Sequence, residues 1–516
     1  MANPGPSLGA KALAGIGLPN TFSVLSALLL GSFVIGAAWS IETTGTALIG
    51  AKDQVVHFFD WLFVLSANAC LLLVIALGLY PKANVKLGDP ATKPEFGYVA
   101  WFAMLFSAGL ASGLLYWATA EPILHHQGNP MLGDAGIAPG SKAAATVALR
   151  ITVMHWGLHG WAFYVVAALG IGVYSYRYGR PLTFRSALIP VVGPRWIDRW
   201  PGRAIDLMAL LGTVCGVATS IGLSAAGMNA TLQSLFGIEI NLSYQTAIVF
   251  GVCALGVASA VSGISRGIRR LSELNVWLSG VLLLAFLALG PAAELVQLVF
   301  TTLVDYTVSF LPTGLWLSET PEEQAWQADW TVFYWGWWLA WTPFVSLFIA
   351  RISKGRTVRE FTLAVMLVPT LVIVLWMAIV GGTALAQEIA NPGAVSTAVN
   401  RDYALGITTV IENLAPPPVS TALVALAAFL LFTWLITSLD SATLVICHLL
   451  DVAESPAAKT FWGAALAAVT VALIWVGGVP ALQAASILIG LPLALIVIAL
   501  GAGLLKDAAM GRLEGR

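Results

Sequence analysis

The chain is poor in charged residues and in cysteine. Only 10% of its 516 residues are charged, and 58% are hydrophobic. So little polar surface excludes a soluble domain of this length, and we expect the lipid bilayer to be the solvent. The net charge of −1 gives no electrostatic basis for binding nucleic acid. The cysteines stand in apolar segments without CxxC spacing, so we expect buried thiols and neither disulfides nor a metal site; they are Cys70, Cys215, Cys253 and Cys447.

The sequence also lacks the phosphate-binding motif G-x-x-x-x-G-K-[ST] and the zinc motif H-E-x-x-H. Nothing therefore indicates a role driven by ATP or a zinc-dependent hydrolase. We expect no enzymatic activity and no cofactor.

Apolar runs of about 20 residues, the length that crosses a bilayer, are abundant. Twelve of them predict an all-α integral membrane protein with twelve transmembrane helices. An even number of crossings places both termini on one side. The approximate limits of the runs are 21–41, 55–80, 96–119, 147–174, 204–229, 243–263, 274–302, 328–351, 360–385, 418–442, 459–478 and 481–505.

The few cations are distributed unevenly between the connections. With these limits, 21 of the 25 Lys and Arg residues fall on one face. Because basic residues are retained on the cytoplasmic side, both termini are predicted to be cytoplasmic, in the cell (inner) membrane. The opposite connections 125–142 and 305–329 are longer, and a short amphipathic helix is expected around Tyr306–Leu311. The four basic residues on the opposite face are Lys52, Lys142, Arg150 and Arg401.

A run of small residues lies in the middle of the third span, from Ser107 to Gly113. One interpretation is close helix packing through the small-xxx-small pair Gly109 and Gly113. The other is a discontinuous helix whose free carbonyls and amides hold an ion and a substrate near the membrane midplane. The two interpretations are compatible.

Aromatic residues are concentrated in two spans. On one continuous helix, Trp156, Trp161 and Tyr164 would share a face. Trp337 and Trp341 are spaced i, i+4, with Trp338 beside them and Pro343 following. Single aromatic stripes are typical of packing or of an interfacial belt. Two of them favour a cage for a quaternary ammonium cation, which offers no N–H group and is attracted to indole faces.

Hydroxyl groups and histidines complete the candidate residues. Thr437 and Ser438 either bond back to their own helix or supply oxygen ligands to a hard monovalent cation. Asp440 is costly at membrane depth and is a further candidate, unless it is solvated at the cytoplasmic end. His155 and His159 have no cysteine or carboxylate within a helical turn, so we expect structural or pore-lining roles rather than metal binding.

Four segments together resemble the betaine/carnitine/choline transporter family. They read AGLASGLLYWATAEP, HWGLHGWAFY, WGWWLAWTPFVSLFIARISKGRTVREF and ITSLDSA, in the family's order over most of the chain. The resemblance implies a leucine-transporter-type core of two inverted five-helix repeats and a homotrimer. The implied parts are an N-terminal segment 1–95, repeats 96–302 and 328–505, a connection 303–327 and a short cytoplasmic tail 506–516.

The resemblance also implies the residues of the sites. The trimethylammonium box would consist of Trp156, Trp161, Tyr164 and Trp338. Residues implied to line the path inward are Trp337, Trp341 and Tyr116. Sodium would bind carbonyls of Ser107, Leu110 and Trp434 and the hydroxyls of Thr437 and Ser438.

Two departures from the family pattern bear on function. The glycine-rich stretch carries Ala111 and Ser112, and it lacks the acidic residue typical of choline-preferring members, which favours a zwitterionic substrate. The short tail gives no basis for osmosensing. We expect sodium-coupled import of a compound such as glycine betaine. Sodium-independent exchange, choline uptake and a ligand-binding sensor are the alternatives, while a channel is disfavoured because indoles, not charges or carbonyls, are the conspicuous lining.

Overall fold

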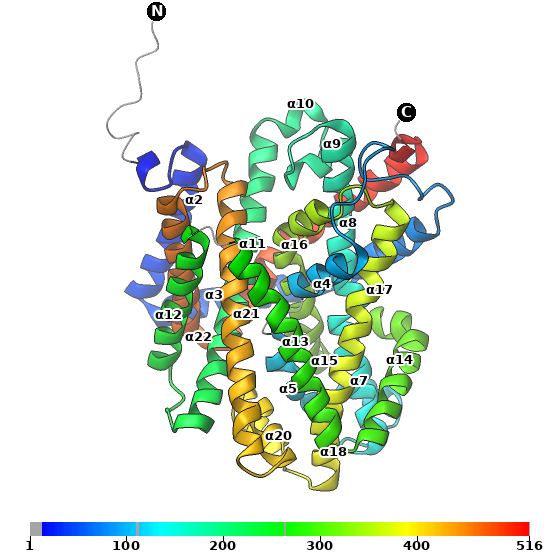
Figure 1. Ribbon diagram of the computed structural model, residues 1–516, viewed down its shortest axis with the longest axis vertical. Helices are drawn as coiled ribbons and strands as arrows, with labels where there is room; N and C mark the ends of the chain where they lie inside the picture. The colour runs from blue at the N-terminus through cyan, green and yellow to red at the C-terminus, as the bar shows by residue number, and fades with distance from the viewer. Residues whose placement is uncertain (1–12, 110–112, 263–264, 515–516) are drawn as a thin grey trace, which may run out of the picture.

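The computed structural model describes residues 13–109, 113–262 and 265–514, and these residues form an all-α protein. In the described part of the chain, the only pairing of extended segments is one antiparallel bridge between Lys86 and Thr357. Many of the long helices run close to the long axis, with α18 (Gly382–Ala390) and α20 (Gly406–Leu414) at one end and α9 (Ile189–Val192) and α10 (Pro194–Ile197) at the other (Figure 1). The predicted all-α membrane fold is confirmed.

Within the described residues, eleven helical segments are long and apolar enough to cross a bilayer. The longest, α22 (Pro456–Ala509), has 54 residues and would measure about 80 Å, against a hydrocarbon core of about 30 Å. Its backbone leaves helical geometry at Gly477 and Gly478, so it consists of two segments that match the predicted spans 459–478 and 481–505. The third predicted span is described as two short helices, α4 (Tyr98–Gly109) and α5 (Gly113–Gln127). The exact count of twelve remains a prediction.

Most of the remaining long helices correspond to predicted spans, and short helices lie in the connections. The predicted start of the second span at residue 55 is wrong, because α3 begins at Ile41, where the side chain of Ser40 accepts a hydrogen bond from the N–H of Thr43 and caps the helix. The bounds of the remaining helices are α2 Thr21–Trp39, α3 Ile41–Leu79, α6 Pro130–Asp134, α7 Lys142–Trp156, α8 Leu158–Tyr178, α11 Trp200–Phe236, α12 Leu242–Ser262, α13 Ser265–Leu289, α14 Ala292–Gly314, α15 Pro321–Gln327, α16 Phe333–Ile352, α17 Val358–Trp376, α19 Ser396–Arg401 and α21 Val419–Leu449.

The predicted span 274–302 is wrong. Helix α13 ends at Leu289, and a separate helix, α14, begins at Ala292. Pro291 lacks a backbone N–H and restricts Gly290 before it, which ends the first helix there. The expected short amphipathic helix around Tyr306–Leu311 is the last part of α14, whose side chains Phe300, Val304 and Val308 are exposed.

The predicted start of the eighth span at residue 328 is also wrong. The helical segment begins at Pro321 with α15, continues through a π-helical turn at Ala328–Val332 and runs into α16. Thr320 and Glu323 form a capping box there, in which each side chain accepts a hydrogen bond from the other residue's backbone N–H. The segment after the last long helix is also shorter than the predicted tail 506–516, since α22 continues to Ala509.

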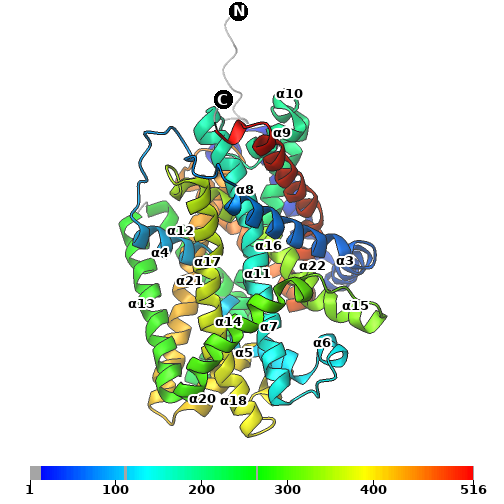
Figure 2. The ribbon, with the colours of Figure 1, turned by 90° about the vertical axis from the view of Figure 1, so that its right-hand side faces the viewer.

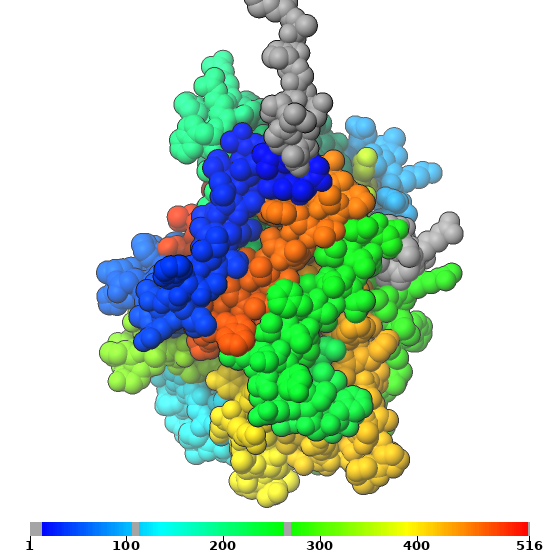
Figure 3. Space-filling view, turned by 90° about the vertical axis from the view of Figure 1, so that its left-hand side faces the viewer, coloured from blue at the N-terminus to red at the C-terminus, as the bar shows by residue number. Residues whose placement is uncertain are grey.

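The central helices are almost wholly buried, whereas the outer ones expose apolar side chains. In the most apolar stretches of the segments α7–α8 and α15–α16, 94% of the residues are buried, against 22% in those of α2 and α13. Figure 3 shows α2, the first half of α22 and α12 side by side on one such outer face. All four cysteines are free; Cys70, Cys253 and Cys447 are buried and Cys215 is partly buried.

A buried cation connects α4 to the loop between α16 and α17. The guanidinium of Arg356 lies 4.4 Å from the ring of Tyr98 and 4.5 Å from that of Trp101. It also forms a 2.6 Å ion pair with Glu360 and donates a 2.6 Å hydrogen bond to the carbonyl of Phe96. The planar guanidinium satisfies these contacts together, which a lysine ammonium cannot do. This arrangement fixes the start of the interrupted third span against the second half of the molecule (Figure 2).

We therefore expect Arg356→Ala to lower the free energy of unfolding by about 2–4 kcal/mol, because Glu360 and the carbonyl of Phe96 lose their partner. Arg356→Lys should recover only part of this loss. Denaturation of the purified protein in detergent measures both. Lys354→Ala is the control, since Lys354 is an exposed cation two residues away, over the ring of Tyr176. Equal stability of the Arg356 and Lys354 variants would contradict the prediction.

Candidate functional site

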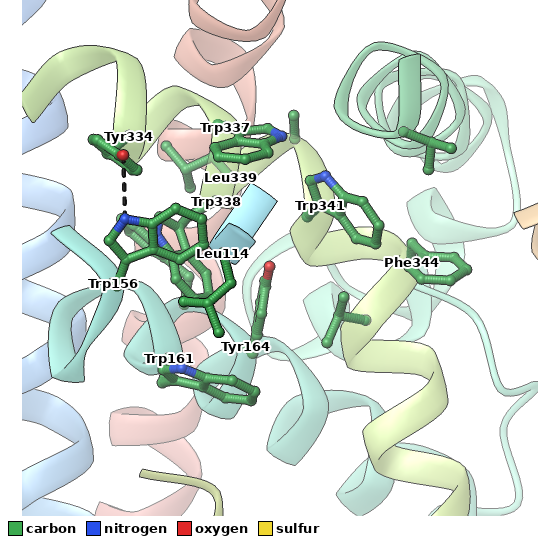
Figure 4. Packing of buried hydrophobic residues seen from close by; sticks show 14 of the residues in the cluster. Leu114, Trp156, Trp161, Tyr164, Tyr334, Trp337, Trp338, Leu339, Trp341 and Phe344 are labelled. Carbon is green, nitrogen blue, oxygen red and sulfur yellow. Dashed lines mark hydrogen bonds between the residues drawn. The ribbon is translucent and has the colours of Figure 1, made fainter. Parts of the chain in front are cut away.

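Four aromatic rings from three helices meet at the centre of the molecule. The ring of Trp338, on α16, lies 6.5 Å from Trp156 at the end of α7, and 5.8 and 5.0 Å from Trp161 and Tyr164 on α8. All four side chains are at most 5% exposed. Figure 4 shows these rings grouped around Trp338. The structure thus brings together the four residues that the resemblance implied for the box, and we call them the aromatic cage.

The route by which they meet differs from the predicted one. The fourth span is not one continuous helix, because α7 ends and α8 begins at Gly157. A Cβ at Gly157 would lie 2.6 Å from the carbonyl oxygen of Val153 and 2.9 Å from the hydroxyl of Tyr306. That hydroxyl accepts a 3.0 Å hydrogen bond from the backbone N–H of Leu158. The prediction that Trp156 and Trp161 share one face of a continuous helix is therefore wrong. The break lets Trp156 turn toward α16 independently of the residues on α8.

Two glycines provide the space for the cage rings. A Cβ at Gly160 would lie 2.2 Å from the indole of Trp338, so this indole rests directly on the backbone of α8. A Cβ at Gly113 would lie 2.6 Å from Trp337 and 3.2 Å from Trp156. Because no real Cβ makes such contacts, the positions of these indoles depend on the two glycines.

The implied path residues are brought together only in part. Trp337 and Trp341 both direct their indole N–H toward the carbonyl of Gly216 on α11, at 3.4 and 2.9 Å. The ring of Trp337 also lies 5.7 Å from Trp156 and therefore borders the cage. Among the described residues, the aromatic ring in contact with Tyr116 is that of Trp117, at 5.0 Å. The structure does not place Tyr116 against the cage rings.

A buried carboxylate that the sequence analysis did not single out lies beside the cage. Glu121, on α5, has 0% exposure and accepts hydrogen bonds at 2.7 Å from the Nδ1 of His155 and at 2.9 Å from the indole of Trp156. The hydroxyl of Tyr334 donates to the same carboxylate at 2.5 Å and also accepts from the indole of Trp156 at 3.1 Å (Figure 4). The signal that could have found it is a glutamate within an apolar segment at membrane depth.

The two histidines of the fourth span are buried, as expected for structural roles. His155 donates from Nδ1 to Glu121 and accepts at Nε2 from the hydroxyl of Thr331, and its backbone carbonyl accepts a 2.8 Å hydrogen bond from the indole of Trp338. His159 packs against the ring of Trp335 at 5.5 Å. The carboxylate beside His155 is that of Glu121, on α5, which the sequence spacing did not reveal. Glu121, His125 and His155 form a cluster of a type that can also hold a metal ion.

The implied sodium ligands are described only in part. On α21, the hydroxyl of Thr437 donates a 2.9 Å hydrogen bond to the carbonyl of Trp434. This hydrogen bond brings two implied sodium ligands together, and it is the bond back to the same helix that the alternative interpretation expects. Ser438 is the next residue of the same helix and is partly buried. Asp440 is buried, with its backbone carbonyl accepting from the hydroxyl of Thr443. The backbone of Ser107, whose carbonyl is an implied sodium ligand, is part of α4, whereas Leu110, Ala111 and Ser112 lie outside the described part of the chain.

Comparison with known proteins agrees with the resemblance. The family model described as betaine/carnitine/choline family transporter matches residues 21–512. Glycine betaine transporter 1 of Vibrio parahaemolyticus is 37% identical over 502 residues, which cover 95% of this chain and 94% of the relative. The glycine betaine transporter OpuD of Bacillus subtilis is 36% identical over 90% of this chain and 89% of its own. A Vibrio parahaemolyticus protein named as a glycine betaine/proline/choline/ectoine transporter is 35% identical over 90% of this chain and 82% of its own.

We expect Gly160→Ala to displace the indole of Trp338 and to lower the free energy of unfolding by about 1–3 kcal/mol, the usual cost of overpacking a core. Gly172→Ala, on the same helix, is the matched control because its Cβ would make only ordinary contacts of 3.5 Å or more. This control should be neutral or stabilising by up to about 1 kcal/mol. Unfolding of the two purified variants in detergent measures the difference, and equal stabilities would mean that the indole moves aside at little cost.

Proposed function

Because this chain belongs to the betaine/carnitine/choline transporter family, we propose that it imports a zwitterionic quaternary ammonium compound, glycine betaine first, by symport with sodium. Carnitine and the sulfonium compound dimethylsulfoniopropionate are the next candidate substrates. The observation that carries the proposal is the aromatic cage of four buried rings around Trp338. A cation without N–H groups cannot be held by hydrogen bonds, but the negative faces of indole and phenol rings attract it.

The hydrogen bonds of the indoles support this assignment. The N–H groups of Trp156, Trp338 and Trp341 are directed to protein acceptors at 2.8 to 2.9 Å. An indole held by its N–H keeps a fixed orientation and leaves its π face for a ligand. Fixed rings reduce the conformational entropy that ligand binding would otherwise cost.

The choice of a zwitterion rests on the amino-acid sequence of the glycine-rich stretch. Residues 110–112 include no acidic side chain that could balance the positive charge of choline, so a substrate that carries its own carboxylate is favoured. The hydroxyl of Ser112 is a donor of the kind that a substrate carboxylate accepts. Choline uptake is accordingly the less favoured alternative.

Coupling to sodium is supported by the adjacent oxygen atoms of Trp434 and Thr437 on α21, with Ser438 next in sequence. Oxygen atoms of this kind suit a hard cation. In sodium-independent exchangers a positive side chain would take the place of the ion. Helix α11 carries no Lys or Arg from residue 204 to 236, which disfavours this alternative mechanism.

The proposed membrane arrangement is a homotrimer in the cell (inner) membrane with both termini in the cytoplasm. The excess of basic residues on one face supports the orientation. The exposed apolar side chains of α12, α13 and α14 offer surfaces for lipid or for further subunits. A ligand-binding sensor is the non-transport alternative, and uptake of labelled betaine into proteoliposomes, with and without a sodium gradient, separates the two.

Replacing Trp338 by Leu should weaken betaine binding several-fold, because the change keeps apolar bulk but removes a π face worth about 0.5–2 kcal/mol. Binding to the purified protein, measured by calorimetry, tests this. Trp39→Leu is the control, since the side chain of Trp39 is 90% exposed at the end of α2. An unchanged betaine affinity in Trp338→Leu would remove the cage from the proposal.

Changing Thr437 and Ser438 together to Ala should raise the sodium concentration required for uptake about tenfold or more, because two oxygen ligands are lost. Sodium dependence of uptake into proteoliposomes is the measurement. Thr443→Ala is the matched control, because its hydroxyl bonds back to the carbonyl of Asp440 in the same helix. A double variant with the parent's sodium dependence would show that these hydroxyls serve only their own helix.

A further inference from the structure

A carboxylate and two imidazoles form a buried cluster directly behind the cage. Glu121, His125 and His155 all have 0% exposure, and one ligand-type atom of each lies within 4.8 Å of the others. His125 stands one turn after Glu121 on α5, with its Nε2 3.4 Å from the carboxylate. His155 approaches from α7, with its Nδ1 at 2.7 Å.

Among the described residues, no lysine or arginine balances the carboxylate of the cluster. The ion pairs that Glu121 forms with described residues are those with the two histidines, and neither Lys nor Arg takes part. An ionised carboxylate at membrane depth is costly unless it is paired or protonated. The charge of the cluster therefore depends on whether one of its three members carries an additional proton.

The two histidines differ in what their protonation would disturb. Both ring nitrogens of His155 are engaged, Nδ1 with Glu121 and Nε2 with the hydroxyl of Thr331 at 3.1 Å. Neither ring nitrogen of His125 has a hydrogen-bond partner of normal geometry among the residues that the structure describes, although the side chain is completely buried. His125 can thus gain or lose a proton without breaking a hydrogen bond of the cage.

The distances favour a proton over a metal ion as the ligand of this cluster. Ligands at 2.0–2.1 Å from a tetrahedral ion stand about 3.4 Å apart. The 2.7 Å separation of His155 Nδ1 and the Glu121 carboxylate oxygen is that of a charge-assisted hydrogen bond instead. The donors from Trp156 and Tyr334 further occupy the second carboxylate oxygen.

Other titratable groups lie near the cluster. Some contact it directly, and others form hydrogen bonds or ion pairs with residues outside it. Tyr334, on α16, donates directly to Glu121, and His159, on α8, lies one turn beyond His155. His126, next to His125, is directed to the carbonyl of Ser141. Charged and phenolic residues on α5, on α7 and on the other elements that pack against them, with their partners where recorded, include Glu388 with Ser396, Asp402 with Ala404, Glu412 with Ser234, Asp206 with Arg185, Arg150 with Asp305, Tyr306 with Leu158, Arg359 with Tyr80, Glu360 with Arg356, and also Tyr116, Lys142, Arg401 and Tyr403.

We propose that Glu121, His125 and His155 form a proton-binding site, and that a proton bound there competes with the cationic head of the substrate. The inference rests on the proposed function, which places that head against the cage. The indole of Trp156 separates the two sites: its N–H is bound to Glu121, and its ring borders Trp337 and Trp338. A cation in the cage is attracted by the deprotonated cluster, which carries the charge of the carboxylate, and this attraction is lost when a bound proton makes the cluster neutral.

The sign of the linkage follows from this competition. If the deprotonated cluster binds the cationic head more tightly, binding expels a proton to the solvent, and affinity rises with pH. Imidazole groups change charge between about pH 5 and 8. We expect the dissociation constant for glycine betaine to fall about three- to tenfold across that range at saturating sodium.

Calorimetry of the purified full-length protein tests the site. Betaine is titrated at about pH 6.5 in phosphate and in imidazole buffer, whose different ionisation enthalpies reveal the number of protons released per molecule bound. The parent should release a measurable fraction of a proton. Glu121→Gln and His125→Asn should still bind betaine, with the proton release lost or strongly reduced. His126→Asn is the matched control and should release protons as the parent does.

Two results would overturn the proposal: betaine binding by the parent without proton release between about pH 5 and 8, or undiminished release in both cluster variants. One zinc ion per purified chain, found by mass spectrometry, would also overturn it in favour of a metal site.

Failure of the parent to bind betaine would instead count against the proposed function. The site is then tested without substrate by pH-difference infrared spectra, in which carboxyl and imidazole bands of the parent should be missing from a variant that carries both Glu121→Gln and His125→Asn, and identical spectra would overturn the site.

Discussion

The arrangement of the aromatic centre depends on hydrogen bonds that three buried indole N–H groups donate to oxygen atoms of the protein. Burying an indole N–H is less costly when it has an acceptor, so an oxygen atom in the right place fixes the orientation of the ring. Trp156 is held by Glu121, Trp338 by the carbonyl of His155, and Trp341 by the carbonyl of Gly216. These three acceptors come from α5, α7 and α11, so the hydrogen bonds of the aromatic residues also join the helices around them.

Close approach of helices makes these hydrogen bonds achievable. Gly160 allows the indole of Trp338 to rest on α8, and Gly336 and Gly490 allow α16 and α22 to cross with a Cβ position of one only 2.7 Å from the Cα of the other. Tight packing of this kind replaces the hydrophobic driving force, which is weak between helices that are already in lipid. The same glycines therefore serve stability and the geometry of the cage.

Much of the fold could be predicted because membrane helices must satisfy their backbone internally and must span a fixed thickness. The apolar runs predicted the helices α2, α3, α11, α12, α17 and α21 within about a turn or two at most ends. The errors fall where polar or special residues decide: Pro291 divides one predicted span, Thr320 and Glu323 start another earlier, and Gly157 interrupts a third. The last error also made the single-face argument for Trp156 wrong, although the motif assigned the residue to the correct group of rings.

The sequence by itself determined the class of protein, the family and the aromatic residues of the cage, because composition and local motifs are properties of neighbouring residues. It could not place Glu121 beside His155, since these residues are separated by 34 positions and meet only when α5 packs on α7. Nor could it reveal that Trp337 and Trp341 share the carbonyl of Gly216, 121 and 125 positions away. Contacts between distant segments depend on how the helices pack, and in this protein that packing decides which polar groups face the cage.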